Sequence, residues 1–284
     1  MWSTLASPDS KRATFLIVQH QLEVLTRHLS EPHGPTAHQR LCALVADLFQ
    51  LAGEIFFDCN QYTEAACCYS SAAHASKEAS AFALWACAIA RHAFIAIYER
   101  RFRGALPMLE LAGRIANRGD GALSTRYWVD AVRANALAGL GDVCAFERAM
   151  ARAEGVRVLR GPVHNGGWLR FDSSRLSEER GACHAALLQP DQAEAALISA
   201  LNQGLSARRC GIVLTDLAMV GVQRRDLSQL STYASAAVDV ARTTGSGVVS
   251  RRLELLRPHL RPLVGNADVR RIHEQISNMT IGHA

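Results

Sequence analysis

The residues that could do chemistry are scattered along this chain. The sequence has 11 histidines and eight cysteines. His33 and His38 lie five positions apart, and no third ligand is nearby in sequence, so they make a poor metal site. Cys183 and His184 are adjacent, and adjacent residues of a helix point about 100° apart, so we do not expect them to pair as nucleophile and base. The sequence predicts no metal site and no catalytic pair.

The longer catalytic motifs are also missing from the sequence. It contains no P-loop, no G-x-G-x-x-G after a strand, no H-E-x-x-H and no G-x-S-x-G. Glu178 and Glu179 stand beside Arg175 and Arg180, and acid–arginine spacings of three or four are typical of helix surface pairs. We therefore expect a protein that is not an enzyme and that needs no cofactor.

The cysteines and the apolar stretches indicate a compartment. No two cysteines have the C-x-x-C spacing that zinc and redox sites favour. No stretch of about 18 uninterrupted apolar residues is present, and the N-terminus lacks the pattern of a signal peptide. We expect eight reduced cysteines in a cytoplasmic protein with no membrane span.

Helices must position whatever side chains carry the function. The 284 residues are 49% hydrophobic but only 6% aromatic, with 46 alanines, and 29 of the 31 basic residues are arginine. Alanine and arginine are strong helix formers, and the apolar spacing is helical nearly throughout. A helix, a short polar turn and a second helix recur about five times. The turns fall at 59–61, 100–101, 140–142, 189–191 and 224–226.

The first copy, from Ala46 to Glu78, matches the tetratricopeptide consensus. Small and large residues alternate in the expected order, and Gly53 and Ala65 should face each other where the helices cross. The matched positions are Phe49, Ala52, Gly53, Phe56, Ala65, Tyr69 and Ala72. The sequence thus predicts an all-α, right-handed superhelix of about five tetratricopeptide-like hairpins with terminal capping helices.

The repeat pattern predicts that the chain has two parts. Residues 1–38 should form an N-terminal helix and linker, and residues 39–284 the helical-repeat domain. The N-terminal helix carries a heptad-like seam that predicts either a cap on the first repeat or a self-association helix for a homodimer. A connector should run from Glu154 to Trp168. The seam residues are Phe15, Val18, Leu22, Leu25 and Leu29.

The first helix of each tetratricopeptide hairpin lines a concave groove, which is the predicted binding surface. Its middle should be apolar and its ends charged, and an amide on its wall could hydrogen-bond an extended peptide in both directions. A peptide or protein segment is the expected ligand. The candidate groove residues are Asp47, Gln50, Glu54, Phe94, Trp128, Asn135, Arg175 and Glu178.

The net charge of +5 lies in the last 80 residues, where 11 arginines oppose six acidic residues. Four arginine doublets occur there. They suggest either an anionic partner such as nucleic acid or a solvated helical surface. Only one aromatic residue, Tyr233, accompanies them, which favours the solvated surface.

The later repeats resemble a known family. The stretches WLRFDSSRLSEERGACHAALLQPDQAEAAL and LSARRCGIVLTDLAMVGVQRRDLSQLSTYASAAVDVARTTGSGVVSRRLELLRPHL resemble the tetratricopeptide-like C-terminal half of actinobacterial transcriptional regulators of the Xre helix-turn-helix type. The resemblance implies a domain that senses a ligand or mediates association. About 40 residues precede the repeats and show no helix-turn-helix, so we do not expect direct DNA binding.

The leading functional hypothesis is a regulatory module that binds a peptide or protein segment. A protein scaffold or adaptor and a small-molecule sensor remain open, as does the choice between a piece of a regulator and a repeat protein that acts alone.

Overall fold

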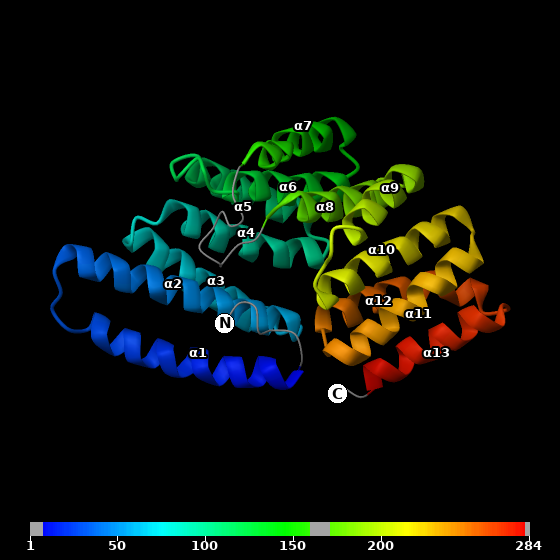
Figure 1. Ribbon diagram of the computed structural model, residues 1–284, viewed down its shortest axis with the longest axis horizontal. Coiled ribbons are helices and arrows are strands. Elements are labelled where there is room, and N and C mark those ends of the chain that lie inside the picture. Colours follow the sequence, from blue (N-terminus) through cyan, green and yellow to red (C-terminus); the bar gives the residue numbers. More distant parts are fainter. Residues whose placement is uncertain (1–7, 160–170, 282–284) are drawn as a thin grey trace. The chain divides into compact units, whose positions relative to one another are not determined.

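The computed structural model describes residues 8–159 and 171–281, and within these ranges its regular elements are helices, with no strand. This confirms the predicted all-α class (Figure 1). None of the described helices has the length and apolarity needed to cross a membrane. The α-helices are α1 (Pro8–Leu29), α2 (Pro35–Asp58), α3 (Tyr62–Glu78), α4 (Phe82–Tyr98), α5 (Phe102–Ala116), α6 (Thr125–Gly139), α7 (Val143–Ala153), α8 (Ser173–Ala186), α9 (Pro190–Leu201), α10 (Ala207–Arg224), α11 (Leu227–Thr244), α12 (Gly247–Leu260) and α13 (Ala267–Ile281).

Each of the five predicted turns overlaps a connection between two helices. They join α2 to α3, α4 to α5, α6 to α7, α8 to α9 and α10 to α11, and each connection has only two or three residues. So short a link makes the two helices antiparallel neighbours. The predicted connector from Glu154 to Trp168 begins with a 3₁₀ turn, η2 (Glu154–Val158), and the rest of it, from residue 160 on, lies outside the described residues.

One turn geometry recurs along the chain. After α2, α3, α4, α6, α8 and α10, a backbone N–H donates to the carbonyl five residues earlier, over 2.7–3.1 Å. The residue before each donor has a positive φ, which is the Schellman arrangement of a helix end. Only one of these six residues is a glycine. They are Asn60, Ser80, Arg100, Gly141, Leu188 and Arg225.

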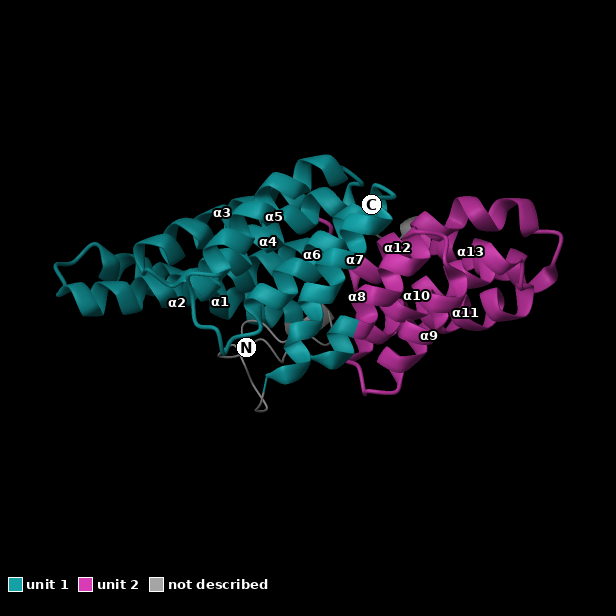
Figure 2. Ribbon diagram, turned by 90° about the horizontal axis from the view of Figure 1, so that it is seen from above, with its two compact units in different colours: residues 1–5, 9–57, 61–176 teal, residues 6–8, 58–60, 177–284 magenta. Residues whose placement is uncertain are grey.

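The chain forms two compact units, which are coloured separately in Figure 2. The first contains Asp9–Phe57 and Gln61–Leu176, and the second contains Asp58–Asn60 and Ser177–Ala284. The structure thus divides inside α8. The division predicted at residues 38 and 39 stays a prediction.

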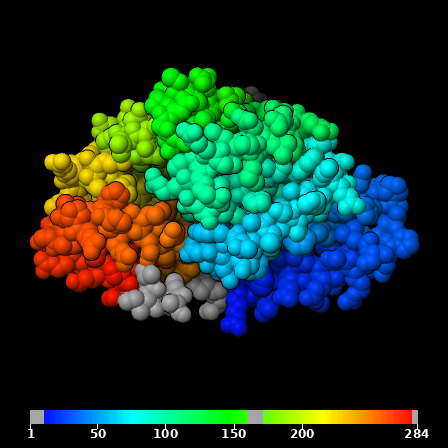
Figure 3. All heavy atoms as spheres, turned by 180° about the vertical axis from the view of Figure 1, so that it is seen from behind, coloured from blue at the N-terminus to red at the C-terminus, as the bar shows by residue number. Residues whose placement is uncertain are grey.

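Packing within each unit is mostly between neighbours in sequence. In the first unit, α3 to α7 contact each other in order and α4 also contacts α6. In the second unit, α10 contacts α9, α11 and α12, and α13 contacts both α11 and α12. The space-filling view shows the same order, since successive colours of the first unit cover adjacent strips of surface (Figure 3). Local packing of this kind is typical of helical repeats.

The helix α1 packs onto α2. Val18 forms a buried cluster with Leu48, Leu51 and Ala52, and Leu22 and Leu25 pack against it. The heptad-like seam therefore faces the first hairpin, as expected for a cap. Whether this helix also mediates self-association stays a prediction.

The helix crossings differ from the sequence prediction by one turn. A Cβ on Gly53 would lie 2.5 Å from the ring of Tyr69, so the glycine makes room for that ring. Gly181 likewise faces Leu197, and its Cβ would lie 2.5 Å from that side chain. The partner in both hairpins is the large residue four positions after the predicted alanine. The small residues Ala65 and Ala193 are themselves fully buried.

Candidate functional site

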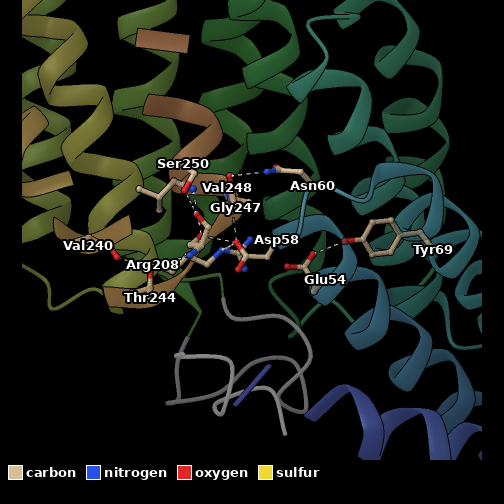
Figure 4. Close-up of polar contacts among 12 residues, drawn as sticks. Glu54, Asp58, Asn60, Tyr69, Arg208, Val240, Thr244, Gly247, Val248 and Ser250 are labelled. Carbon is tan, nitrogen blue, oxygen red and sulfur yellow. Dashed lines mark hydrogen bonds and ion pairs between the residues drawn. The ribbon is translucent and has the colours of Figure 1, made fainter. Parts of the chain in front are cut away.

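A buried polar network joins the first three helices of the predicted repeat array. Gln50 and Glu54 lie one turn apart on the same face of α2. The Gln50 Nε2 donates to the Leu84 carbonyl (3.1 Å), and its Oε1 accepts a hydrogen bond from Arg91 Nη1 (2.7 Å). The Arg91 Nε lies 3.4 Å from Glu54 Oε1, which also accepts from the Tyr69 hydroxyl over 2.9 Å (Figure 4).

Burial and neighbouring charges determine the protonation of Arg91 and Cys87 in this network. Burial lowers the pKa of Arg91, but its charge interactions with Cys87, Glu54, Tyr69 and Asp47 outweigh burial and raise the pKa overall. Burial raises the pKa of the Cys87 thiol to about 12, so this thiol stays protonated at neutral pH. The network is therefore a buried ion pair between Arg91 and Glu54, which Gln50 and Tyr69 hold in place by hydrogen bonds.

Aromatic rings lie beside the network. The rings of Phe57 and Tyr98 are 4.9 Å apart in an edge-to-face arrangement, and Phe94 lies 5.6 Å from Tyr98 and 6.3 Å from Phe57. Phe57 is buried, whereas Phe94 and Tyr98 are half-buried on α4. Together they give the first unit an accessible apolar surface next to a buried charge.

The structure divides the predicted groove residues into two groups. Asp47, Glu54, Phe94, Asn135 and Arg175 are half-buried, so part of each side chain is accessible. Gln50, Trp128 and Glu178 are buried, with exposures of 0%, 5% and 4%. Glu178 belongs to the second unit, where its carboxylate lies 2.6 Å from Arg209 Nε. These three side chains are held by packing and hydrogen bonds.

Sequence reasoning did not identify Arg91, Tyr69 and Tyr98 as members of this site. A signal for Arg91 was present, since it is the one arginine inside the apolar helix α4. A charged residue in such a helix is buried only with a partner. Its partner Gln50 is 41 positions away, and the sequence alone does not pair them.

A cavity of the first unit lies on another side of α2. It has a volume of about 670 Å³ and lies between α1, α2 and α3. Phe49, Ala52 and Phe56 face it, and helical geometry places them nearly opposite Asp47 and Glu54 on α2. The other lining residues are Phe15, Val18, Gln19, Leu22, Glu23, Thr26, Arg27, Ser30 and Cys68.

The arginine doublets of the second unit are largely paired within it. One arginine of each doublet binds an acidic residue: Arg209 binds Glu178, Arg224 binds Asp191 and Glu194, Arg252 binds Asp216, and Arg271 binds Asp268. The other arginine of the first doublet, Arg208, lies 3.2 Å from Asp58, which also accepts from the Ser246 hydroxyl over 2.6 Å (Figure 4). Much of the basic charge thus joins helices, which favours the solvated, structural interpretation.

Three potential metal ligands come together at one end of the first hairpin. His38 Nε2 lies 2.7 Å from Glu78 Oε1 and 3.5 Å from Cys42 Sγ. Burial, and then the charge of Glu78, raises the pKa of the Cys42 thiol. The sequence indicated only His33 as a neighbour of His38, but His33 instead contacts the His28 carbonyl. The spacing of four between His38 and Cys42 was the missed signal.

All eight cysteines carry free thiols.

No protein-family model and no curated protein matches this chain.

Proposed function

We propose that the chain is a non-enzymatic regulatory binding module: a tetratricopeptide-like sensor or interaction domain of a cytoplasmic transcriptional regulator. Its hairpins would stack as a right-handed superhelix and bind a peptide or protein segment in the groove. The recurrent tight turns, the sequential packing and the small residues at the helix crossings support this proposal.

One observation carries the proposal: the buried Arg91 contacts Glu54, while Asp47 and Glu54 on α2 and Phe94 and Tyr98 on α4 are only half-buried. Two carboxylates against one guanidinium leave a local charge of −1, and the two rings supply apolar contact. This chemistry fits an extended segment in which a basic side chain alternates with an apolar one. Asn135 would hydrogen-bond the backbone of that segment.

The test compares two labelled peptides of equal length, one alternating leucine with arginine and the other leucine with glutamate. We expect the full chain to bind the basic peptide at least about tenfold more tightly by fluorescence anisotropy. The chain carries a net charge of +5, so attraction by its overall charge would give the opposite preference. Equal affinity for the two peptides contradicts the proposal.

Variants locate the binding. Phe94→Ala and Asn135→Ala should each weaken binding of the basic peptide, and Glu54→Gln should reduce the preference for the basic over the acidic peptide. Glu147→Gln removes an exposed carboxylate on α7 and is the matched control. If Glu147→Gln lowers the affinity as much as Glu54→Gln does, the peptide binds elsewhere.

A small-molecule sensor is the second candidate, and the cavity between α1, α2 and α3 favours it. Its volume of about 670 Å³ falls in the usual range for ligand pockets, and its lining is largely apolar. An apolar effector there would contact α1 and the first hairpin together. Anilinonaphthalene sulfonate should fluoresce on binding the wild type and less on binding Cys68→Phe, which fills the cavity. The neighbouring Cys67→Phe, at an exposed position, should bind the dye as the wild type does.

A further inference from the structure

We propose that His38, Cys42 and Glu78 form a site for Zn²⁺, in which the imidazole, the thiolate and the carboxylate each supply one ligand and water completes a tetrahedron. The ligand atoms all lie within 4.8 Å of one another. This site is independent of the peptide-binding face.

The fold brings the three residues together for a simple reason. His38 and Cys42 are four apart near the start of α2, so they share one face of that helix. Glu78 is the last residue of α3, which runs antiparallel to α2 after a three-residue turn. The open end of the hairpin therefore places the end of α3 beside the start of α2.

The distances fit a tetrahedral zinc site. With Zn–N and Zn–O bonds of about 2.0–2.1 Å and a Zn–S bond of about 2.3 Å, tetrahedral ligand atoms lie about 3.3–3.6 Å apart. The separation of 3.5 Å between Cys42 Sγ and His38 Nε2 already has this value. The contact of 2.7 Å between His38 and Glu78 is a hydrogen bond, and it would open by about 0.6 Å to admit the ion.

The site combines one fixed ligand with two accessible ones. Cys42 is 1% exposed, so packing holds its sulfur in place. The side chains of His38 and Glu78 are 35% and 60% exposed, and they can move by a fraction of an ångström and admit an ion from solvent. The neighbouring basic residues in sequence are Arg40, which is exposed on α2, and Lys77, whose amino group lies 5.9 Å from the centre of the Trp85 ring.

The ligand types select the metal. A thiolate and an imidazole disfavour Mg²⁺ and Ca²⁺, which prefer oxygen, and they suit Zn²⁺. A thiolate and a carboxylate together neutralise the divalent charge. Bound Zn²⁺ would join the start of α2 to the end of α3 and close the first hairpin at the end opposite its turn.

Cobalt substitution tests the proposal, since Co²⁺ occupies zinc sites and absorbs visible light. We expect the reduced full chain to bind one Co²⁺ with a thiolate-to-cobalt charge-transfer band, and Zn²⁺ to displace it. Cys42→Ala should abolish the band. His38→Ala and Glu78→Gln should lower the affinity at least about tenfold. Zn²⁺ should also raise the melting temperature of the wild type but not of Cys42→Ala.

Matched controls come from the same hairpin. Cys67→Ala removes an exposed thiol of α3, and His74→Ala removes an exposed imidazole one turn before Glu78. Both should bind Co²⁺ as the wild type does. Because Cys42→Ala changes a buried residue, the exposed Glu78→Gln provides the variant that does not disturb folding. The proposal is overturned if no thiolate band appears, if the band survives in Cys42→Ala, or if Glu78→Gln binds with unchanged affinity.

Discussion

In the first unit three glycines lie against aromatic rings, whereas in the second unit three glycines lie against aliphatic side chains or backbone atoms. Gly53, Gly139 and Gly155 face Tyr69, Phe102 and Tyr127, and a Cβ on each would lie 2.2–2.5 Å from the ring. Gly181, Gly211 and Gly221 face Leu197, Val240 with Val249, and Leu230. A ring at the end of a side chain can shift to relieve a contact, but backbone cannot. Gly221, whose added Cβ would meet the backbone of Leu230, should therefore tolerate substitution less well than Gly53.

The two units also place their charges differently. The first buries Arg91 in a network with an amide, a carboxylate and a phenol. The second spreads arginine–carboxylate pairs across neighbouring helices, as Arg252 with Asp216 and Arg224 with Glu194 illustrate. Charge is thus concentrated at one buried point in the first unit and distributed in the second.

All four tryptophans precede residue 177, which makes the comparison measurable. Trp85 and Trp128 lie in α4 and α6 of the first unit, so their fluorescence reports the unfolding of that unit, and far-ultraviolet circular dichroism reports both units.

The largest loss of unfolding free energy is expected from Arg91→Ala. The substitution removes the partner of buried Gln50 and Glu54, and losing one member of a buried charged group costs about 3–5 kcal/mol of unfolding free energy. Arg252→Ala, its counterpart in the second unit, should cost about 1–3 kcal/mol, because the side chains of that pair are 21% and 15% exposed. Urea unfolding followed by both signals measures the two values. Equal losses would show that charge is not concentrated in the first unit.

The next largest losses of unfolding free energy are expected when a glycine at a helix crossing is replaced by alanine. A Cβ on Gly221 would lie 2.6 Å from the backbone nitrogen of Leu230, so Gly221→Ala must separate two helices and should cost about 2–3 kcal/mol. In Gly53→Ala the ring of Tyr69 can move, and alanine's better helix propensity recovers about 1 kcal/mol. We expect its net loss to be about 1–2 kcal/mol. Urea unfolding measures both losses. If Gly53→Ala loses more unfolding free energy than Gly221→Ala, a ring at a crossing is harder to displace than backbone, contrary to this prediction.

A smaller effect depends on pH. Burial raises the pKa of Asp216, against the attraction of Arg252, and burial likewise raises the pKa of Asp130 in the first unit. A carboxyl group whose folded pKa is raised binds its proton more tightly when folded. Its contribution to stability is therefore present below the unfolded pKa and is lost as pH rises through the folded pKa.

Replacing either carboxyl group by an amide removes this dependence. The effect of Asp216→Asn on the unfolding free energy, relative to wild type, should move in the stabilising direction between pH 3 and pH 7. Asp130→Asn should do the same in the first unit. Asp239→Asn, at an exposed position of α11, is the control. A shift toward destabilisation with rising pH would mean that the arginine partner outweighs burial.

The smallest effect is expected from Arg224→Ala. Its side chain is 28% exposed, and those of its partners Asp191 and Glu194 are 88% and 32% exposed. Such pairs contribute about 0–1 kcal/mol because water and salt screen them. A loss comparable to that of Arg91→Ala would show that the distributed pairs of the second unit act as one network.

Local features were predictable from the sequence, and contacts between distant helices were not. The turn at 59–61, the other four turns and the cap-like seam of α1 follow from helical periodicity and polar turn residues. Arg91 with Gln50, and Glu78 with His38, depend on the register between helices separated by about 40 residues. Register varies with small shifts in crossing angle, so a pattern within one helix does not fix its partner. The same limit explains why Tyr69, rather than Ala65, lies against Gly53.

The Schellman turns have a consequence for directed stabilisation. Five of the six turn residues with positive φ carry a side chain, although glycine adopts that conformation with little strain. Replacing Leu188 or Arg225 by glycine should add about 0.5–1 kcal/mol of unfolding free energy at each site. Leu188, whose side chain is also 74% exposed, is the first choice. Neither position belongs to the proposed zinc site or to the peptide-binding face, so a more heat-resistant protein could be engineered without changing either one.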